Sequence, residues 1–458
     1  MATSNDRMTN IVLITIDCLR ADHMGCYGYH RDTSPNIDKL ASRGVLFSRA
    51  ISNGGGTPEA FPSILASIPP PVHYEEYKSI INENVTIAEV LRGNGYETAA
   101  FHSNPYLSRF FHYDKGFDTF DDSLSLAGSV QREQIKGMMS KPGSSLAKLL
   151  SKLDNLLAVV GPPIIRAEQI TSKALAWLRE HPNKFFLWLH YMDVHHPYMP
   201  PSEFRRQFYN RPPNHYQMLK LYNKISRKPD RVSSYDLERL HGLYDAGIRY
   251  VDTSIGSLFN KLGERLGNTI IIVTADHGEA LGEHGTFGHN SLYEEIIRVP
   301  LIINIPGRTK ATTVKSQVSS LDIAPTILDI LNIEKEEALH GESLIPVIKQ
   351  EKRSVDGTLS VGLNYPVGQR MFSYRTEDSK YIYTERIDKG VKTVYREFYT
   401  LEDDPGEERN SCEEHCEKAQ EFELKIFNYI SRVTQERIQK KTKHEKERIT
   451  RKIKRLNL

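Results

Sequence analysis

Three side chains in the sequence have the chemistry of a metal centre, and they follow two apolar runs. Asp17 comes directly after residues 11–16 (IVLITI), and Asp276 and His277 come shortly after residues 269–273 (TIIIV). Carboxylate oxygens and an imidazole nitrogen together suit a divalent cation. Such a cation would act as a Lewis acid and neutralise an anionic substrate. A single Asp at a strand end is more often a helix cap, but the three residues together favour metal binding.

A second group of candidate residues is rich in imidazoles. Its members follow the apolar run at 185–189 or the segment that contains His277; they are His190, Asp193, His195, His196 and His289. Histidines near a metal can protonate a leaving group or stabilise an oxyanion. In an alternative interpretation, Asp193, His196 and His289 hold a second metal ion.

Both groups must be positioned by the same sheet if they are to act together. The three apolar runs are typical of parallel strands buried on both faces, and helical patterns lie between them, for example at 34–43 and 237–266. Strands that alternate with helices predict an α/β fold with a doubly wound, mostly parallel sheet flanked by helices. Because such sheets bind ligands at the carboxyl ends of their strands, we expect the two groups to converge there.

The chain divides into three predicted parts. A catalytic domain is expected over residues 1–347, with an insertion at about 121–170 where the strand–helix alternation stops. Segments rich in Tyr and Thr predict a small C-terminal α+β subdomain with antiparallel strands over residues 348–416. Residues 417–458 are expected to form a basic helical tail, since residues 431–458 carry eleven Lys or Arg against three Glu, a charge of +8.

The composition excludes a membrane-spanning protein. Hydrophobic residues make up 39% and charged residues 26%, as in globular proteins, and no run approaches the roughly 20 apolar residues of a transmembrane helix. The start of the chain is polar, so we expect no secretory signal. The four cysteines are expected to be reduced thiols, which favours a cytoplasmic location.

Nine segments, taken together, resemble the sulfatase branch of the alkaline-phosphatase superfamily. They occur in the order of that family and span residues 10–410. They are DCLRADH at 17–23, GCYG at 25–28, TSPNID at 33–38, YDAGIRYVD at 244–252, DHGEALGEHG at 276–285, RVPL at 298–301, LDIAPT at 321–326, HGESL at 340–344 and FYTLEDDPGE at 398–407. The resemblance implies an alkaline-phosphatase-like fold and a metal-dependent hydrolase that acts on ester bonds.

The resemblance also implies which residues bind the metal. Asp17, Asp276 and His277 match the family's ligands for one divalent ion, with calcium expected and manganese, zinc or magnesium as alternatives. Cys18 stands where many members have a second aspartate and others have threonine. On this resemblance, Cys18 is expected not to be a ligand.

Two further residues match positions that act on the ester in the family, and three others are expected to bind the substrate. His195 matches a histidine that contacts the ester, and His289 matches a residue that binds the transferred group or protonates the leaving oxygen. Arg20, His196 and Asn104 are expected to bind the substrate, although Asn104, which precedes a proline, also suits a turn.

The nucleophile position departs from the family pattern. Members carry a Cys or Ser, oxidised to formylglycine, in the pattern C/S-x-P-S-R; here Pro62 and Ser63 match, but Ala60 takes the nucleophile position and Ile64 replaces the arginine. A methyl group cannot attack sulfur or phosphorus, so formylglycine is not expected. Four explanations stay open: an engineered variant, natural loss of catalysis, Thr57 as a substitute nucleophile, or attack by Ser63 or a metal-activated water. We favour Thr57, whose alternative role is to cap the following helix.

The sequence therefore predicts metal-dependent hydrolysis of sulfate esters, or of related phosphate or phosphonate esters. The alternatives are a catalytically impaired or engineered Ala60 variant that binds an anionic ligand, and a two-metal phosphodiesterase. The expected partners are a small sulfated or phosphorylated substrate and a second copy of the chain in a homo-oligomer. The basic tail suggests an anionic membrane surface or nucleic acid as a further partner, although a solvated or frayed terminal helix is the favoured explanation.

Overall fold

A computed structural model of the chain describes residues 9–123, 165–307, 310–351, 356–364 and 368–456. The insertion predicted at about 121–170 therefore lies almost entirely outside the described residues.

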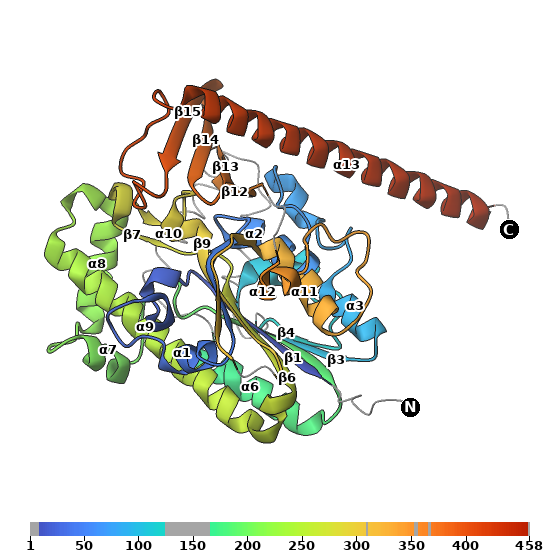
Figure 1. The fold of residues 1–458 in the computed structure, drawn as a ribbon, viewed down its shortest axis with the longest axis horizontal. Helices are drawn as coiled ribbons and strands as arrows, with labels where there is room; N and C mark the ends of the chain where they lie inside the picture. The colour runs from blue at the N-terminus through green and yellow to red at the C-terminus, as the bar shows by residue number, and fades with distance from the viewer. Residues whose placement is uncertain (1–8, 124–164, 308–309, 352–355, 365–367, 457–458) are drawn as a thin grey trace.

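A nine-stranded mixed sheet forms the centre of the molecule (Figure 1). Its strands follow the order β10-β2-β9-β6-β1-β5-β3-β4, with β11 paired to β2. Their bounds are β1 Asn10–Ile16, β2 Val45–Ile51, β3 Glu97–Phe101, β4 Thr119–Asp121, β5 Phe185–Tyr191, β6 Thr269–Ala275, β9 Arg298–Asn304, β10 Thr312–Val314 and β11 Val318–Ser319. All pairings are parallel except those of β9 with β2 and β6, so the predicted α/β fold with a mostly parallel sheet is confirmed.

The three strands predicted from the apolar runs are neighbours in the sheet. β1 lies between β5 and β6, and every residue of the three strands is buried. Ile16 at the end of β1 pairs with Tyr191 of β5 and with Ala275 of β6. The strands thus end at the same level, and the residues that follow them meet at one edge.

Helices cover both faces of this sheet (Figure 1). On one side lie α1, α6 and α9, and on the other α2, α3, α11 and α12. The bounds of the helices are α1 Pro35–Ala41, α2 Thr57–Ala66, α3 Ile87–Gly93, α6 Ala167–Glu180, α7 Ser202–Phe208, α8 His215–Arg227, α9 Ser234–Leu262, α10 Glu294–Ile297, α11 Ile323–Ile330, α12 Ile345–Ile348 and α13 Cys416–Leu456. None of the helices in the described ranges combines the length and apolar character needed to span a bilayer.

The C-terminal part forms a separate antiparallel sheet of four strands, in the order β12-β13-β14-β15. The strands are β12 Thr358–Asn364, β13 Gln369–Arg375, β14 Ser379–Asp388 and β15 Val391–Thr400. A two-stranded ribbon of β7 Ala280–Leu281 and β8 Phe287–Gly288 lies within the catalytic part of the chain. The four strands fall within the range expected for the small subdomain, whose boundaries stay a prediction.

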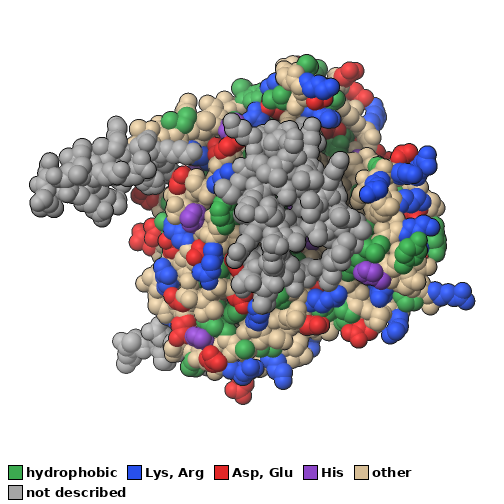
Figure 2. All heavy atoms as spheres, turned by 180° about the vertical axis from the view of Figure 1, so that it is seen from behind, with side chains coloured by type: hydrophobic (Ala, Val, Ile, Leu, Met, Phe, Trp, Pro, Cys, Tyr) green, Lys and Arg blue, Asp and Glu red, His purple; other side chains and the backbone are tan. Residues whose placement is uncertain are grey.

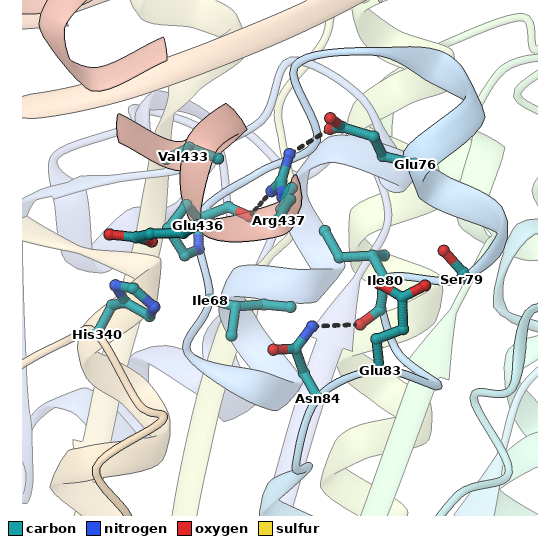
Figure 3. Close-up of a pocket in the computed structure, with 11 residues that line it drawn as sticks. Ile68, Glu76, Ser79, Ile80, Glu83, Asn84, His340, Val433, Glu436 and Arg437 are labelled. Atoms are coloured by element: carbon teal, nitrogen blue, oxygen red, sulfur yellow. Dashed lines mark hydrogen bonds and ion pairs between the residues drawn. The ribbon is translucent and has the colours of Figure 1, made fainter. Parts of the chain in front are cut away.

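The long helix α13 packs on the C-terminal sheet and then leaves the body of the protein (Figure 1). Phe422 and Ile426 are buried against the strands, and Arg437 pairs with Glu76 and donates to the carbonyls of Pro69 and Pro70 (Figure 3). The face shown in Figure 2 carries interspersed acidic and basic side chains rather than a field of one sign.

Candidate active site and metal centre

The carboxylates predicted to bind a metal meet at the carboxyl edge of β1 and β6. His277 Nε2 lies 3.5 Å from Asp276 Oδ2 and 3.8 Å from Asp17 Oδ1, and the three residues offer ligand atoms within 4.8 Å of one another. All three side chains are fully buried. The structure thus brings together residues that lie more than 250 positions apart, because their strands are neighbours in register.

His277 is oriented as metal-binding histidines are. Its Nδ1 lies 2.9 Å from the carbonyl oxygen of Gly278, which fixes the proton on Nδ1 and leaves a lone pair on Nε2. Nε2 is buried without a hydrogen-bond partner and faces the two carboxylates. A buried acceptor of this kind is costly unless a ligand satisfies it.

The carboxyl groups of Asp17 and Asp276 have very different pKa values. Burial raises the pKa of Asp17, but the hydrogen bond from His190 and the neighbouring imidazoles outweigh it and hold this pKa well below its usual value. Burial and the charge of Asp17 raise the pKa of Asp276 to about 7. Two buried carboxylates side by side resist ionising together, and a divalent cation would relieve this repulsion.

The Thr57 hydroxyl sits directly against these carboxylates. Thr57 is the first residue of α2, and its Oγ1 donates to Asp276 Oδ2 at 3.0 Å and lies 3.5 Å from Asp17 Oδ2. Its side chain does not cap the helix, because the N-cap residue is Gly56 and no side-chain cap is formed there. The capping role considered for Thr57 is therefore wrong.

Ala60 lies one turn further along α2 and is fully buried. The hydroxyl-bearing residue of this helix that reaches the carboxylates is Thr57, since Ser63 donates to the carbonyl of Ile68 instead. The pattern match through Pro62 and Ser63 placed the nucleophile position at Ala60. The residue whose hydroxyl contacts the carboxylates, Thr57, lies three positions earlier.

Asn104 and His190 hold Asp17 from the other side. Asn104 Nδ2 donates to Asp17 Oδ2 at 2.9 Å, and its Oδ1 accepts from the backbone N–H of Tyr106. His190 Nε2 lies 3.3 Å from the same Asp17 oxygen. Asn104, predicted to bind substrate, is thus fully buried as a support for Asp17 and as the cap of a short turn.

The predicted imidazole group gathers beside the metal cluster. His195, His196 and His289 offer ligand atoms within 4.8 Å of one another, and the ring centroids of His277 and His289 lie 4.6 Å apart. Burial and the neighbouring His196 lower the pKa of His195 to about 4, so this ring is neutral at neutral pH.

Glu279 links the imidazoles and was not singled out in the sequence. Its Oε1 lies 3.0 Å from His196 Nδ1 and 3.5 Å from His289 Nδ1, while its Oε2 is buried without a partner. Burial raises the pKa of Glu279, but His196 and His289 outweigh it and lower this pKa well below its usual value. Burial lowers the pKa of His196, but Glu279 outweighs it and raises that pKa. Glu279 directly follows Asp276, His277 and Gly278, and this position is the sequence signal that could have identified it.

The guanidinium of Arg20 is engaged by neighbouring residues and is not free to face the carboxylates. Its Nε and Nη2 donate to Asp22, and its Nη1 donates to Glu283 and to the carbonyl of Glu279. The prediction that Arg20 binds the substrate is therefore corrected: it holds the loop that carries Glu279 and Glu283.

Asp193 lies apart from the imidazole group. It is buried, its Oδ2 has no hydrogen-bond partner, and burial raises its pKa to about 7. The groups of potential ligands found in the described part of the chain include His195, His196 and His289 but not Asp193. The second metal site predicted from Asp193, His196 and His289 is thus not assembled as expected.

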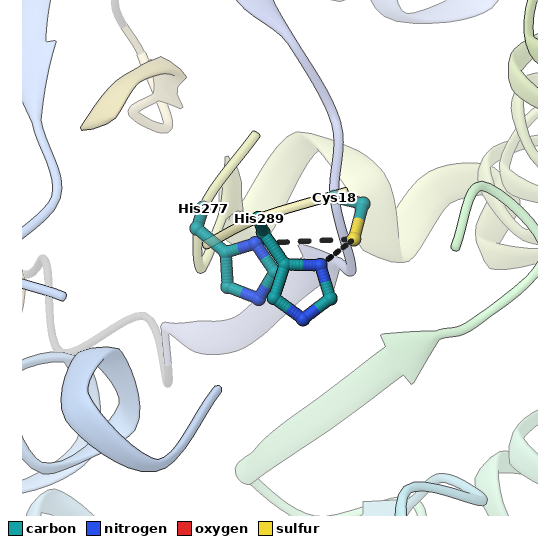
Figure 4. Close-up of side chains that lie close together, drawn as sticks. All are labelled: Cys18, His277 and His289. Atoms are coloured by element: carbon teal, nitrogen blue, oxygen red, sulfur yellow. Dashed lines mark hydrogen bonds between the residues drawn. The ribbon is translucent and has the colours of Figure 1, made fainter. Parts of the chain in front are cut away.

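Cys18 also faces the centre of the site (Figure 4). Its Sγ lies 3.1 Å from Asp17 Oδ1 and 3.8 Å from Nδ1 of both His277 and His289. Burial and the surrounding carboxylates raise the pKa of this thiol. The donor set of two carboxylates, an unpartnered imidazole nitrogen and a nearby sulfur fits a divalent metal ion.

A separate pocket lies between α13 and the segment around Glu76 (Figure 3). It shares no residue with the carboxylate and imidazole groups. We therefore place the functional site at the sheet edge.

Two family models and several relatives match this chain. The family described as "Sulfatase" matches residues 9–333, and "N-sulphoglucosamine sulphohydrolase, C-terminal" matches residues 282–435. Iduronate 2-sulfatase of Mus musculus is 30% identical over 343 residues, which cover 66% of this chain and 60% of the relative. An arylsulfatase of Clostridium perfringens is 28% identical over 451 residues, which cover 89% of this chain and 92% of the relative.

Solved structures share the fold. A structure of an enzyme in complex with its substrate D-glucosamine-2-N,6-O-disulfate aligns with a TM-score of 0.69 at 21% identity, covering 94% of this chain and 99% of that chain. A phosphonate monoester hydrolase of Agrobacterium radiobacter aligns with a TM-score of 0.65 at 19% identity, covering 94% of this chain and 96% of that chain.

Proposed function

The chain belongs to the sulfatase family, whose members are hydrolases that act on ester bonds, and we propose that it hydrolyses sulfate esters with Thr57 as the nucleophile. The observation that carries this proposal is the Thr57 hydroxyl, which donates to Asp276 within the carboxylate cluster. A serine or threonine hydroxyl becomes a competent nucleophile when a neighbouring base takes its proton.

Asp17, Asp276 and His277 would hold the divalent ion. When bound, the ion supplies Lewis-acid polarisation and neutralises the anionic ester. The carboxylates and imidazole alone suit calcium, as first expected, and equally manganese, magnesium or zinc.

The residues of the chain provide the proton transfers. Thr57 Oγ1 forms a bond to sulfur as the bond from sulfur to the leaving oxygen breaks, and the hydroxyl proton passes to Asp276. His289, which is a quarter exposed and lies beside Glu279, gives a proton to the leaving oxygen. Water then hydrolyses the sulfate ester of Thr57 and regenerates the hydroxyl.

The remaining imidazoles bind the anionic group. His196 carries a positive charge more readily because Glu279 raises its pKa, so it attracts the sulfate oxygens. His195, which is neutral because of its lowered pKa, offers a hydrogen bond without adding charge.

The substrate class is drawn from the named relatives. Iduronate 2-sulfatase and the complex with a disulfated glucosamine favour a sulfated carbohydrate. The phosphonate monoester hydrolase with the same fold keeps phosphonate and phosphate esters as the second candidate. Parallel assays with aryl sulfate, aryl phosphate and phenyl phosphonate esters rank these classes.

Substitution of Thr57 tests the proposal. We expect Thr57→Ala to lower kcat by at least about 10⁴-fold, since loss of a nucleophile costs that much in other hydrolases, and Thr57→Ser to keep activity within about tenfold. Thr253→Ala, at an exposed position of α9, is the matched control and leaves activity unchanged. Unchanged turnover by Thr57→Ala contradicts the proposal.

An inactive wild-type chain that gains turnover in Ala60→Ser or Ala60→Cys supports the alternative of an impaired enzyme that binds an anionic ligand. We expect no such gain, because the hydroxyl that already contacts the carboxylates is that of Thr57.

The basic tail and the cellular location stay separate proposals. The charge of +8 over residues 431–458 favours an anionic membrane surface or nucleic acid, and the four free cysteines favour the cytoplasm. Because Arg437 pairs with Glu76, a truncation after Gln439 removes most of the charge without disturbing this contact. Unchanged binding to anionic vesicles and to nucleic acid would remove the tail proposal. Sedimentation of the full chain tests the proposed homo-oligomer.

A further inference from the structure

The turn that precedes Thr57 is held by the C-terminal sheet, and we propose that Asn53 and Ser360 position this turn for the reaction. Residues 52–56 form the turn, which connects the end of β2 to Thr57, the first residue of α2. β12 of the C-terminal sheet lies beside α2 (Figure 1). The inference rests on the proposed function for the role of Thr57 as nucleophile, and it gives the C-terminal sheet a part in catalysis.

The backbone of the turn is joined to β12. The N–H of Gly55 donates to the carbonyl of Val361 at 2.9 Å, and the N–H of Val361 donates to the carbonyl of Asn53 at 2.9 Å. Gly54 and Val361 thus form a parallel bridge between the turn and the C-terminal sheet. Thr57 follows three positions after this bridge, so the position of β12 determines where α2 begins.

The side chain of Asn53 ties the turn to two other segments. Its Nδ2 donates to the carbonyl of Leu359 in β12 at 2.9 Å. Its Oδ1 accepts from the hydroxyl of Ser319 at 2.7 Å and from the N–H of Leu321 at 3.2 Å. A backbone carbonyl on one side and a backbone N–H on the other fix the orientation of the amide. Because Asn53 is 2% exposed, its loss would leave these groups without their partner and away from water.

Ser360 in β12 makes a further contact with the turn. Its hydroxyl donates to the carbonyl of Ser52 at 2.5 Å, and both serines are fully buried. The hydroxyl of Ser52 in turn contacts the carbonyl of Asp276, which directly follows β6. The turn therefore joins the C-terminal sheet to the strand end that carries a proposed metal ligand.

Close packing leaves the turn little room to move. A Cβ atom on Gly54 would lie 2.3 Å from the backbone nitrogen of Ala60 in α2, and one on Gly55 would lie 2.8 Å from Leu292 Cδ2. Contacts this short require glycine at both positions. Misplacing a reacting group by about 1 Å can cost about 100-fold in rate, so a rigid turn is what keeps the Thr57 hydroxyl effective against the carboxylates.

The simpler interpretation is that these contacts only stabilise the C-terminal sheet. Variants would then unfold more easily, but their folded molecules would turn over substrate like the wild type. Positioning predicts instead that kcat falls in fully folded variants while KM stays the same, because His195 and His196, which are proposed to bind the anionic group, follow β5 and are separate from the turn.

Two buried serines of the C-terminal sheet provide a matched test. Ser360 and Ser373 lie opposite each other in β12 and β13, and both are fully buried, but the Ser373 hydroxyl has no hydrogen-bond partner among the described residues. We expect Ser360→Ala to lower kcat about tenfold with KM within about twofold, and Ser373→Ala to leave both unchanged. Asn53→Ala removes more contacts and should lower kcat at least about 100-fold. Full-length variants are assayed with an aryl sulfate, and urea unfolding shows that each is folded under the assay conditions.

Hydrogen exchange measures the turn without relying on turnover. Mass spectrometry of the full-length proteins should show at least about tenfold faster exchange of the amides of residues 54–60 in Asn53→Ala, a smaller increase in Ser360→Ala, and none in Ser373→Ala. If Asn53→Ala fails to fold, the comparison of Ser360→Ala with Ser373→Ala decides.

The outcomes separate this inference from the proposed function. Folded variants that keep wild-type kcat, even with lower stability, overturn the inference and leave Thr57 as the proposed nucleophile. Unchanged exchange of residues 54–60 in Asn53→Ala and Ser360→Ala also overturns it. A wild type without turnover of any of the ester classes overturns the proposed function and, with it, this inference.

Discussion

Two clusters of buried charged residues in this protein differ in how their charges are balanced. The first, here called the ion-pair cluster, consists of Glu294, Arg375, Lys380 and Glu407 between α10 and the C-terminal sheet. Arg375 donates twice to Glu294 at 2.9 Å, and Lys380 lies 3.1 Å from Glu294 and 2.6 Å from Glu407. Two cations thus face two anions, and the charge is balanced within the protein.

The second, here called the carboxylate cluster, consists of Asp17, Asp276 and Glu279 at the sheet edge. All three are fully buried, and within the described part of the chain none of them has a lysine or arginine as an ion-pair partner. Their neighbours are imidazoles, and two buried atoms, His277 Nε2 and Glu279 Oε2, have no hydrogen bond. Three carboxylates gathered without a cationic side chain leave their charge unbalanced, so a bound cation is expected here, whereas the ion-pair cluster needs none.

The largest expected effect is on the carboxylate cluster. Asp276→Asn removes a proposed metal ligand and the proposed acceptor of the Thr57 proton, so we expect kcat/KM to fall at least about a thousandfold, or about 4 kcal/mol of transition-state stabilisation. Steady-state kinetics with an aryl sulfate measure it. Asp32→Asn, an exposed carboxylate paired with Arg249, is the control and stays at wild-type activity. Equal activity of Asp276→Asn and wild type would remove the functional distinction between the two clusters.

The ion-pair cluster should instead respond in stability. Lys380→Met leaves Glu407 buried without a cationic partner and leaves Glu294 with Arg375 alone, so we expect the free energy of unfolding to fall by about 3 kcal/mol, as when buried pairs lose one partner. Metal affinity should not change. Urea unfolding measures the first quantity and zinc competition the second. Lys418→Met removes an exposed pair with Asp378 and should change stability by less than about 1 kcal/mol. A loss of metal affinity in Lys380→Met would show that the two clusters are not independent.

Glu59 is a buried carboxylate outside both clusters. The smallest of the expected effects, a pH-dependent change in stability, concerns this residue. It lies in α2, no lysine or arginine among the described residues forms an ion pair with it, and burial raises its pKa to about 8 from 4.5. The folded state therefore binds the proton more tightly than the unfolded state, and stability contributed by protonated Glu59 is lost as pH rises from about 4.5 to 8.

Glu59→Gln removes this dependence. Relative to wild type, we expect the variant to gain about 1–2 kcal/mol in stability between pH 5 and pH 8. Thermal unfolding over this pH range measures the difference, and the exposed Glu75→Gln should show none. Parallel pH profiles for Glu59→Gln and wild type would mean that this carboxylate is ionised in the fold.

Much of the carboxylate cluster could be predicted from the sequence, because the apolar runs show where the central strands end. Apolar runs ending in Asp17 and Asp276 indicate central strands, and parallel neighbours in register must deliver those residues to one edge. The antiparallel strand β9 inside the large sheet was not predicted, since its apolar run gives no information on direction.

The errors came from side-chain detail that spacing does not encode. Arg20 was expected to bind substrate, but only the fold brings Glu283 and Asp22 to its guanidinium. The pattern match of Pro62 and Ser63 placed Ala60 at the family's nucleophile position, while the favoured nucleophile, Thr57, is the residue whose hydroxyl contacts the carboxylates. The ion-pair cluster was invisible in the sequence, because its members come from β13, β14, α10 and a turn.

Metal content tests the central claim most directly. Full-length wild type, Asp17→Asn and Lys380→Met are equilibrated with a small excess of Zn²⁺ or Mn²⁺, desalted and analysed for bound metal per chain. We expect close to one ion per chain in the wild type and in Lys380→Met, and loss of most of the metal in Asp17→Asn. A wild type without tightly bound metal, or an Asp17→Asn variant that retains it fully, would contradict the conclusion that the unbalanced carboxylates at the sheet edge exist to hold a cation.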